Sequence, residues 1–259
     1  MKPIEKYPTD WTKDDLSEFL EKTYRNTLAS FSNLRQQYTL LQEIEGCFRT
    51  ITQNLNNTNN IDVAGFLIRA HSSYLASVRL GLAGQVIEAY SLLRNCLENA
   101  FYGIHIYRIP NLYEIWIRRD ESEEKKKKVR KEFELNKMLS SLEFYDEKLK
   151  DICKLLYERT IDIGAHPNEK SITSIMNINE DDAKIEYRFE YLFCNNIFQD
   201  FCLISTAQVG ICSLNIFKYI YRIRFDLLGL SDKVESLKKE TERLQIKLKN
   251  RKYSKIQQE

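Results

Sequence analysis

The chain has 259 residues, of which 43% are hydrophobic and 29% are charged, and its net charge is close to balanced at +2. This composition excludes a disordered chain, because enough apolar surface is available to form a core. The small net charge gives the whole molecule no strong electrostatic footprint for nucleic acid. Eight glycines and four prolines are few for this length, which favours long helices over a turn-rich sheet fold. The sequence therefore predicts an all-α, multi-helix bundle.

The cysteines and histidines predict neither a disulfide framework nor a metal site. Six cysteines lie mostly among apolar residues without a Cys-x-x-Cys pair, and the three histidines are not paired at ligand spacing. Such cysteines are typical of buried thiols in a reducing cytoplasm. P-loop, dinucleotide and nucleophile-elbow motifs are also missing. We expect a cytoplasmic protein without a cofactor or a metal.

Apolar residues recur every three or four positions over most of the chain, which predicts amphipathic helices. In chain order, the expected helices are a short one that ends near Tyr24 and others over 28–55, 61–82, 85–106 and 145–163, from about 195, and from 231 onward. The apolar stretch 201–217 contains five uncharged polar residues, so we expect a buried core helix and no membrane span. The charged stretch 121–132 alternates acids and bases at i,i+4 spacing, which favours a solvated helix over an RNA-binding face.

One segment departs from helical spacing. Between residues 184 and 191 large apolar residues alternate with charged ones, which is the period-two pattern of a strand. The apolar residues of this alternation are Ile185, Tyr187, Phe189 and Tyr191. A partner strand just upstream would complete a hairpin. We predict one small β-hairpin near 172–191, packed on the bundle.

The C-terminal helix carries a heptad pattern. Its repeating residues are Leu227, Leu230, Val234, Leu237, Thr241, Leu244 and Leu248. Such a seam packs either against a second copy, as a coiled coil, or against an antiparallel helix of the same bundle. The chain is therefore divided into N-terminal helices (1–60), a helical core (61–228) and a C-terminal heptad helix (229–259).

The helix over 85–106 is apolar on most faces but carries one polar stripe. The stripe residues are Glu88, Ser91, Asn95, Glu98 and Tyr102. Arg94 lies four residues before Glu98 and can pair with it. A buried carboxylate needs a partner, and the candidates across the bundle are Arg69, His71, Arg159 and His166. The stripe is therefore either a satisfied structural network or a polar ligand pocket.

Two segments resemble a known family. The segment 158–170 reads ERTIDIGAHPNEK, with six residues between Arg159 and His166. An arginine followed by a histidine at this spacing, late in a helical bundle, resembles the signature of HEPN-type ribonucleases. The segment 88–103, EAYSLLRNCLENAFYG, resembles the central helix of bacterial HEPN-like proteins. The resemblance covers roughly residues 61–228.

The resemblance implies metal-independent RNA cleavage in a site shared by two subunits, with the RNA 2′-hydroxyl attacking the adjacent phosphate. Arg159 would stabilise charge on the phosphoryl group. His166 would move or position the proton. A plainer interpretation is a helix end, because a cation in the last turn complements the exposed carbonyl groups.

Three functional hypotheses follow. The first is a homodimeric HEPN-like endoribonuclease, acting on RNA as a toxin or antiphage defence effector, with a neutralising or activating protein partner. In this hypothesis Arg159 and His166 are catalytic, and the supporting polar residues are Arg94, Glu98, Glu88, Asn95 and His71. The second is a non-catalytic interaction module that recruits a partner through the heptad helix. The third is a small-ligand sensor with an enclosed cavity at the polar stripe.

Overall fold

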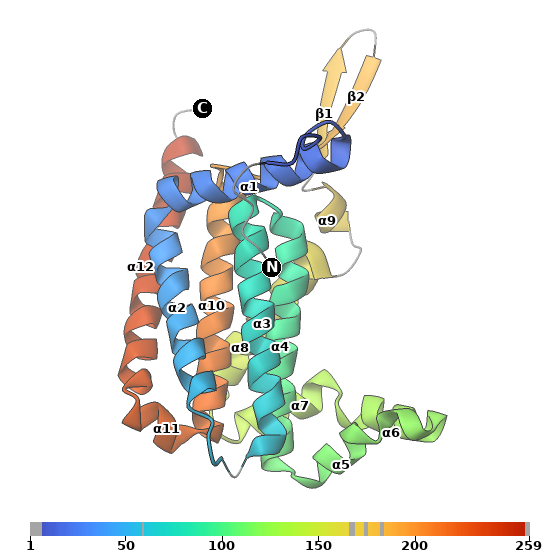
Figure 1. The fold of residues 1–259 in the computed structure, drawn as a ribbon, viewed down its shortest axis with the longest axis vertical. Helices are drawn as coiled ribbons and strands as arrows, with labels where there is room; N and C mark the ends of the chain where they lie inside the picture. Colours follow the sequence, from blue (N-terminus) through green and yellow to red (C-terminus); the bar gives the residue numbers. More distant parts are fainter. Residues whose placement is uncertain (1–6, 59, 166–168, 174–175, 182–183, 257–259) are drawn as a thin grey trace.

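The structure is a computed structural model of the chain and describes residues 7–58, 60–165, 169–173, 176–181 and 184–256. These residues form an all-α bundle with one β-hairpin, as the sequence predicts (Figure 1). Most of the long helices run along the long axis of the molecule, and the N-terminal one (Asp15–Asn33) lies across one end. The hairpin projects from one end, and a short helix, α6 (Glu123–Glu132), projects from the other.

The element bounds follow from the backbone. The longer helices are α1 (Asp15–Asn33), α2 (Arg35–Gln53), α3 (Ile61–Ala83), α4 (Val86–Arg108), α8 (Glu147–Thr160), α10 (Ile197–Ile220) and α12 (Leu230–Ile256). The shorter helices are α5 (Asn111–Ile117), α6 (Glu123–Glu132), α7 (Leu135–Glu143), α9 (Glu169–Thr173) and α11 (Arg222–Leu227), with a 3-10 turn, η1 (Arg119–Glu121), and a π-helical turn, η2 (Ile161–Ala165). The strands are β1 (Met176–Asp181) and β2 (Lys184–Phe189).

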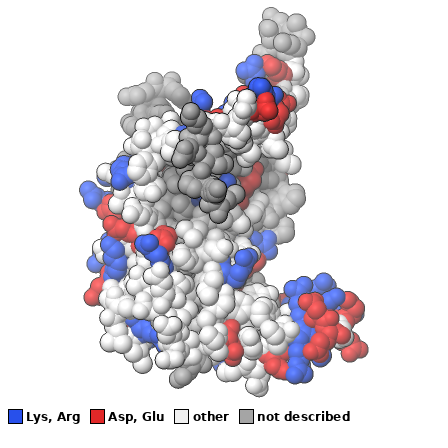
Figure 2. All heavy atoms as spheres, viewed as in Figure 1, with Lys and Arg blue, Asp and Glu red and all other residues white. Residues whose placement is uncertain are grey.

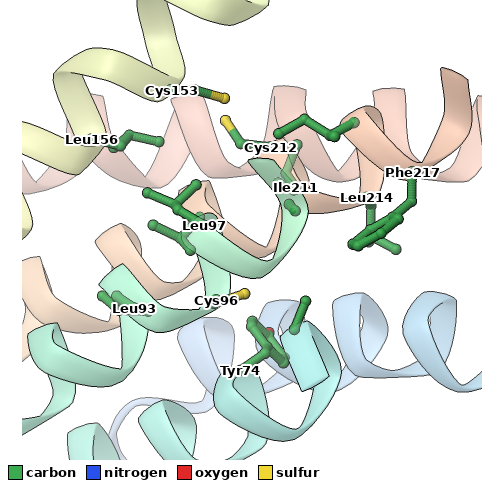
Figure 3. Close-up of a cluster of buried hydrophobic side chains, with 14 of the residues drawn as sticks. Tyr74, Leu93, Cys96, Leu97, Cys153, Leu156, Ile211, Cys212, Leu214 and Phe217 are labelled. Carbon is green, nitrogen blue, oxygen red and sulfur yellow. The ribbon is translucent and has the colours of Figure 1, made fainter. Parts of the chain in front are cut away.

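Helix α10 lies at the centre of the bundle and packs against α2, α3, α4, α8 and α12. It is long and apolar enough to cross a membrane, but 78% of its most apolar window is buried inside the protein. The expected core helix is therefore confirmed. Figure 3 shows a cluster of buried side chains from α3, α4, α8 and α10 in the core. In it the thiol groups of Cys153 and Cys212 point toward one another. All six cysteines are free.

At two positions glycine meets a different structural requirement. Gly84 ends α3 with a φ of 87°, a left-handed conformation that favours glycine, which confirms the expected break between α3 and α4. Gly210 lets α10 approach α3, because a Cβ atom there would lie 2.6 Å from the ring of Tyr74. The bundle is therefore packed too closely at Gly210 for a larger residue without rearrangement.

The heptad seam of α12 faces the interior of its own chain. Its side chains at Leu230, Val234, Leu237 and Leu244 are all buried, and α12 packs antiparallel to α10 and also against α2 (Figure 1). Leu227 lies before α12 and is 81% exposed. The sequence allowed the seam to pack either against a second copy or within its own bundle. In the structure it packs within the bundle, so these side chains are not available to a second copy.

The N-terminal helices differ from the expected bounds. The first helix does not end near Tyr24 but continues to Asn33, and the break falls at Leu34, where φ is −108° and ψ is 44°. No glycine or proline lies between Tyr24 and Leu34. The side chains of Asn26 and Ser30 also donate hydrogen bonds to carbonyl groups at the end of α3. These contacts stabilise the second half of α1, so the helix continues beyond Tyr24.

The hairpin forms where the period-two pattern predicts it. Strands β1 and β2 are antiparallel, with Met176 opposite Phe189 and Asp181 opposite Lys184. However, the hairpin extends away from the bundle (Figure 1), and Ile185, Tyr187 and Phe189 are at least half exposed. The expectation that it packs on the bundle is therefore wrong, because no described bundle helix covers its aromatic side chains.

The charged helix α6 is solvated, as expected. Figure 2 shows acidic and basic groups interleaved on a lobe that stands out from the molecule. Lys125 pairs with Glu121, and Lys126 pairs with Glu123 at 2.8 Å. Interleaved acids dilute the positive field, so this lobe is a poor site for a polyanion.

Candidate functional site

Arg159 lies in the last turn of α8, and its side chain extends to α10. The Nη1 atom donates hydrogen bonds to Gln208 Oε1 at 2.7 Å and to Ser205 Oγ at 3.2 Å. The guanidinium group also lies over the ring of Phe201, 5.1 Å from its centroid. The side chain is mostly buried, yet it forms no ion pair with any described carboxylate. Within the described part of the chain, all hydrogen-bond partners of Arg159 are therefore neutral.

These contacts belong to a longer chain of hydrogen bonds. On one side, the hydroxyl of Tyr90 on α4 donates to Ser205 Oγ at 3.1 Å. On the other side, Gln208 Nε2 donates to Gln245 Oε1 on α12 at 3.2 Å. We call Tyr90, Ser205, Arg159, Gln208 and Gln245 the polar chain. It links the four helices α4, α8, α10 and α12, and Arg159 is its only charged member.

Arg159 lines a groove of about 750 Å³ between α8, α10 and α12, which we call the α8–α12 groove. Its charged lining residues are the bases Lys148, Arg159, Lys218, Arg222 and Lys238 and the acids Asp146, Glu235 and Glu242. The Asp146 carboxylate already caps the first turn of α8 and accepts the Tyr219 hydroxyl at 2.9 Å. Bases therefore outnumber acids along the groove, which favours an anionic occupant.

The electrostatics of Arg159 suit anion binding. Burial lowers the pKa of the guanidinium, and among its neighbours only Tyr90 and Cys212 oppose the shift. The group nevertheless stays cationic near neutral pH, because an arginine remains charged throughout the physiological range. Its Nε and Nη2 atoms donate to no described residue. An oxyanion in the groove could therefore accept two parallel hydrogen bonds from this free edge.

Arg94 and Glu98 form a separate network with Tyr157. Arg94 Nε donates to Glu98 Oε1 at 2.8 Å, as expected from their spacing, and the Tyr157 hydroxyl donates to the same oxygen at 2.9 Å. Arg94 also lies over the Tyr157 ring at 5.2 Å. Burial, and then Glu98, raise the pKa of Tyr157 to about 12. Tyr157 and Arg159 are two residues apart on α8 and so point in nearly opposite directions. Arg94 and Glu98 therefore do not contact Arg159.

The other residues of the expected supporting network are also apart. Glu88 is exposed. Asn95 Oδ1 accepts hydrogen bonds from Ser73 Oγ at 2.6 Å and from Asn99 Nδ2 at 3.0 Å. The α8–α12 groove includes none of Glu88, Asn95 and Glu98. The enclosed cavity predicted at the polar stripe is therefore a different site from the α8–α12 groove, which other described residues form.

His71 faces α2 rather than the polar stripe. Its ring stacks on Phe48 with centroids 5.3 Å apart, and its Nε2 atom lies 3.6 Å from Glu45 Oε1. This distance is too long for a hydrogen bond, and Nε2 is an enclosed nitrogen without a partner. Burial lowers the pKa of His71, so the neutral form dominates and the contact with Glu45 is weak. His71 does not support the candidate site.

His166 lies outside the described residues, so its geometry relative to Arg159 stays a prediction. The turn that leads toward it is described. Helix α8 does not stop at Gly164 but continues as η2, and a Cβ atom on Gly164 would lie 2.2 Å from the Ile87 carbonyl oxygen of α4. Ser91 Oγ also donates to the Gly164 carbonyl at 3.1 Å. Arg159 is therefore not at a free helix end, since the chain continues in a turn docked on α4.

Sequence reasoning missed the partners of Arg159. Ser205 and Gln208 are visible as uncharged polar residues three positions apart in an apolar helix, and this spacing places them on one face. That signal could have identified a polar contact inside the bundle. It could not identify Arg159 as the partner, because periodicity does not say which helix covers a face.

Comparisons with models of known protein families, with characterised proteins and with solved structures found no match to this chain. Among the described residues, no cluster of three or more His, Cys, Asp or Glu side chains could hold a metal ion. The candidate site therefore stands on the geometry of Arg159, the polar chain and the groove.

Proposed function

We propose that the protein binds an RNA phosphate group in the α8–α12 groove and cleaves the RNA, as the resemblance to HEPN-type ribonucleases implies. The observation that carries this proposal is the edge of Arg159 formed by Nε and Nη2, which donates to no described residue. A mostly buried guanidinium with neutral partners and no described carboxylate is costly to fold. A groove in which bases outnumber acids supports an anion as the missing counter-charge.

The chemistry assigned to these residues needs no metal. The 2′-hydroxyl loses its proton and attacks the adjacent phosphorus, and the bond to the 5′-oxygen of the next nucleotide breaks. The products are a 2′,3′-cyclic phosphate and a 5′-hydroxyl. Arg159 stabilises the negative charge that grows on the phosphoryl oxygens. His166 transfers or positions a proton, because an imidazole titrates near neutral pH.

In the cell, the proposed role is a toxin or defence effector that acts on cytoplasmic RNA under the control of a second protein. The rival hypothesis of a heptad helix that recruits a partner lost its main support, because the α12 seam is buried within the bundle. A ligand sensor is the second candidate, now with its site in the α8–α12 groove and not at the polar stripe. It is favoured by the polar chain, through which an occupant bound at Arg159 would contact hydrogen bonds that connect four helices.

The test is cleavage of total bacterial RNA by the purified protein in the presence of EDTA. The variants are Arg159→Met and His166→Ala, with Arg243→Met as the matched control. Arg243 is exposed on α12, and Glu240, at 3.3 Å, is its only partner among the described residues. Removal of one oxyanion donor typically costs a factor of roughly 10²–10³ in rate. We expect losses of that size in the first two variants and none in the control.

The variants separate this proposal from contamination, because a contaminating ribonuclease would cleave RNA equally in every preparation, and the products identify the reaction. Fragments should carry a cyclic phosphate and a 5′-hydroxyl, detected by their resistance to ligation before phosphorylation. Intact RNA with the wild type, or cleavage by Arg159→Met at the wild-type rate, contradicts the proposal. Binding of the RNA without cleavage would support the sensor instead.

A further inference from the structure

Two cysteine side chains, Cys153 on α8 and Cys212 on α10, meet in the core. Figure 3 shows their thiol groups pointing toward one another from the two helices. Both thiols are free and both side chains are buried. Burial, and then the contact with the Cys212 thiol, raise the pKa of Cys153. The two sulfur atoms are therefore neighbours across the contact between α8 and α10, and their side chains face one another as a disulfide requires.

The two thiols differ in what they can reach. Cys212 lines the α8–α12 groove, whereas Cys153 does not. Cys212 is also close enough to Arg159 to oppose the lowering of the arginine pKa. Cysteines that react with oxidants lie beside cations and within reach of small reagents, whereas cysteines enclosed by apolar groups are inert. Cys212 is therefore the thiol that a small oxidant meets, and Cys153 lies behind it.

A third cysteine, Cys96 on α4, is a poorer partner for Cys212. Its thiol is already in a contact of 3.4 Å with Ser213 Oγ. In Figure 3 it lies apart from the two thiols that face one another. Cys153 is therefore the partner that the geometry selects.

We propose that Cys212 and Cys153 form an oxidation site that takes hydrogen peroxide and yields a disulfide within one chain. The Cys212 thiolate attacks one peroxide oxygen, the O–O bond breaks, and the departing hydroxide takes up a proton and leaves as water. Cys212 is then a sulfenic acid, oxidised by two electrons, and the peroxide is reduced. The Cys153 sulfur gives up its proton and attacks the Cys212 sulfur. The S–O bond breaks, and a second water leaves.

The disulfide would join the two helices that hold Arg159 in place. Helix α8 carries Arg159, and α10 carries its partners Ser205 and Gln208. Gln208 and Cys212 are four residues apart on α10, so they share one face. Oxidation therefore fixes α8 on α10 about one helical turn from the Arg159 contacts. In a reducing compartment such a disulfide is transient and acts as a sensor. The proposal does not depend on the RNA hypothesis, because no groove occupant takes part in the reaction.

The test is mass spectrometry of the folded protein after treatment with hydrogen peroxide. The wild type should lose the mass of two hydrogen atoms, and tandem spectra of its fragments should assign the link to Cys153 and Cys212. With dimedone present, Cys153→Ser should carry one adduct on Cys212, because no second thiol resolves the sulfenic acid. Cys212→Ser should give neither product. The matched control is Cys194→Ser, which removes a partly exposed thiol elsewhere and should form the disulfide as the wild type does.

Thermal melting gives a second readout. The oxidised wild type should unfold at a temperature roughly 5–10 °C higher than the reduced form, because the disulfide restricts the unfolded chain. A reductant should reverse this shift. Circular dichroism should show that each variant is folded before treatment, and Cys153→Ala repeats the test without a buried hydroxyl. A wild type that keeps its thiols free, a disulfide between Cys212 and Cys96, or a dimedone adduct on Cys153 in Cys212→Ser overturns the proposal.

Discussion

Replacing Arg159 with methionine separates a binding role from a structural one. If the guanidinium exists to hold an anion, the folded protein carries it at a cost, and its removal should cost little stability. If the guanidinium exists to hold α8 on α10, its removal should destabilise the bundle. Methionine fills a similar volume and keeps a contact with the Phe201 ring, which makes the comparison one of charge and hydrogen bonds.

The magnitude follows from the contacts of Arg159. The variant loses hydrogen bonds to Ser205 and Gln208, each worth about 1.5–3 kcal/mol if fully buried and less beside an open groove. Ser205 keeps the bond from Tyr90, and Gln208 keeps the bond to Gln245. The cation–π contact, worth about 0.5–1 kcal/mol, is exchanged for a sulfur–aromatic contact of similar size. The variant also no longer buries a cation, which acts in the opposite direction and stabilises the folded state. We expect the free energy of unfolding to change by no more than about 1 kcal/mol.

The assay is urea unfolding, with and without a 2′-O-methyl RNA oligonucleotide that cannot be cleaved. At ten times its Kd, such a ligand should add about 1.4 kcal/mol to the wild type, a shift in Tm of roughly 3–6 °C, and nothing to Arg159→Met. Arg94→Met is the comparison for stability. It breaks the ion pair with Glu98 and should cost about 1–2 kcal/mol. A loss of about 3 kcal/mol or more in Arg159→Met, the size expected for a broken buried ion pair, would refute the binding role.

Two further predictions concern packing and pH. Gly210→Ala should destabilise the protein by about 1–3 kcal/mol, because the new methyl group meets the Tyr74 ring. The control Gly46→Ala, in open space on α2, should stabilise it by roughly 0.5–1 kcal/mol. Equal effects of the two substitutions in thermal melts would contradict this packing. Burial lowers the pKa of His105, whose ring bonds to a hydroxyl and a carbonyl group. Below about pH 6.5 the unfolded state therefore takes up a proton that the folded state resists, so stability should fall between about pH 7 and pH 5. His105→Gln should flatten this slope in urea titrations at each pH, and an unchanged slope would show that other groups cause it.

Much of the local architecture could be predicted from the sequence. The three-to-four periodicity predicted the helices, the alternation at 184–191 predicted the hairpin, and the uncharged polar residues of 201–217 predicted a core helix. The Arg94–Glu98 pair also followed from spacing alone. These features depend on contacts within one element or between neighbours in sequence, so the order of side chains is enough to determine them.

Tertiary structure decided what each face meets. The heptad seam of α12 was equally suited to a second copy or to its own bundle, and only the fold placed it on α10 and α2. The polar face of α1 turned inward because Ser30 and Asn26 found carbonyl groups at the end of α3, which no periodicity indicates. Arg159 was selected from sequence as one of a pair with His166, yet its contacts are Ser205 and Gln208, more than forty residues away. Spacing determines which side chains share a face, whereas the partner of that face depends on contacts distant in sequence.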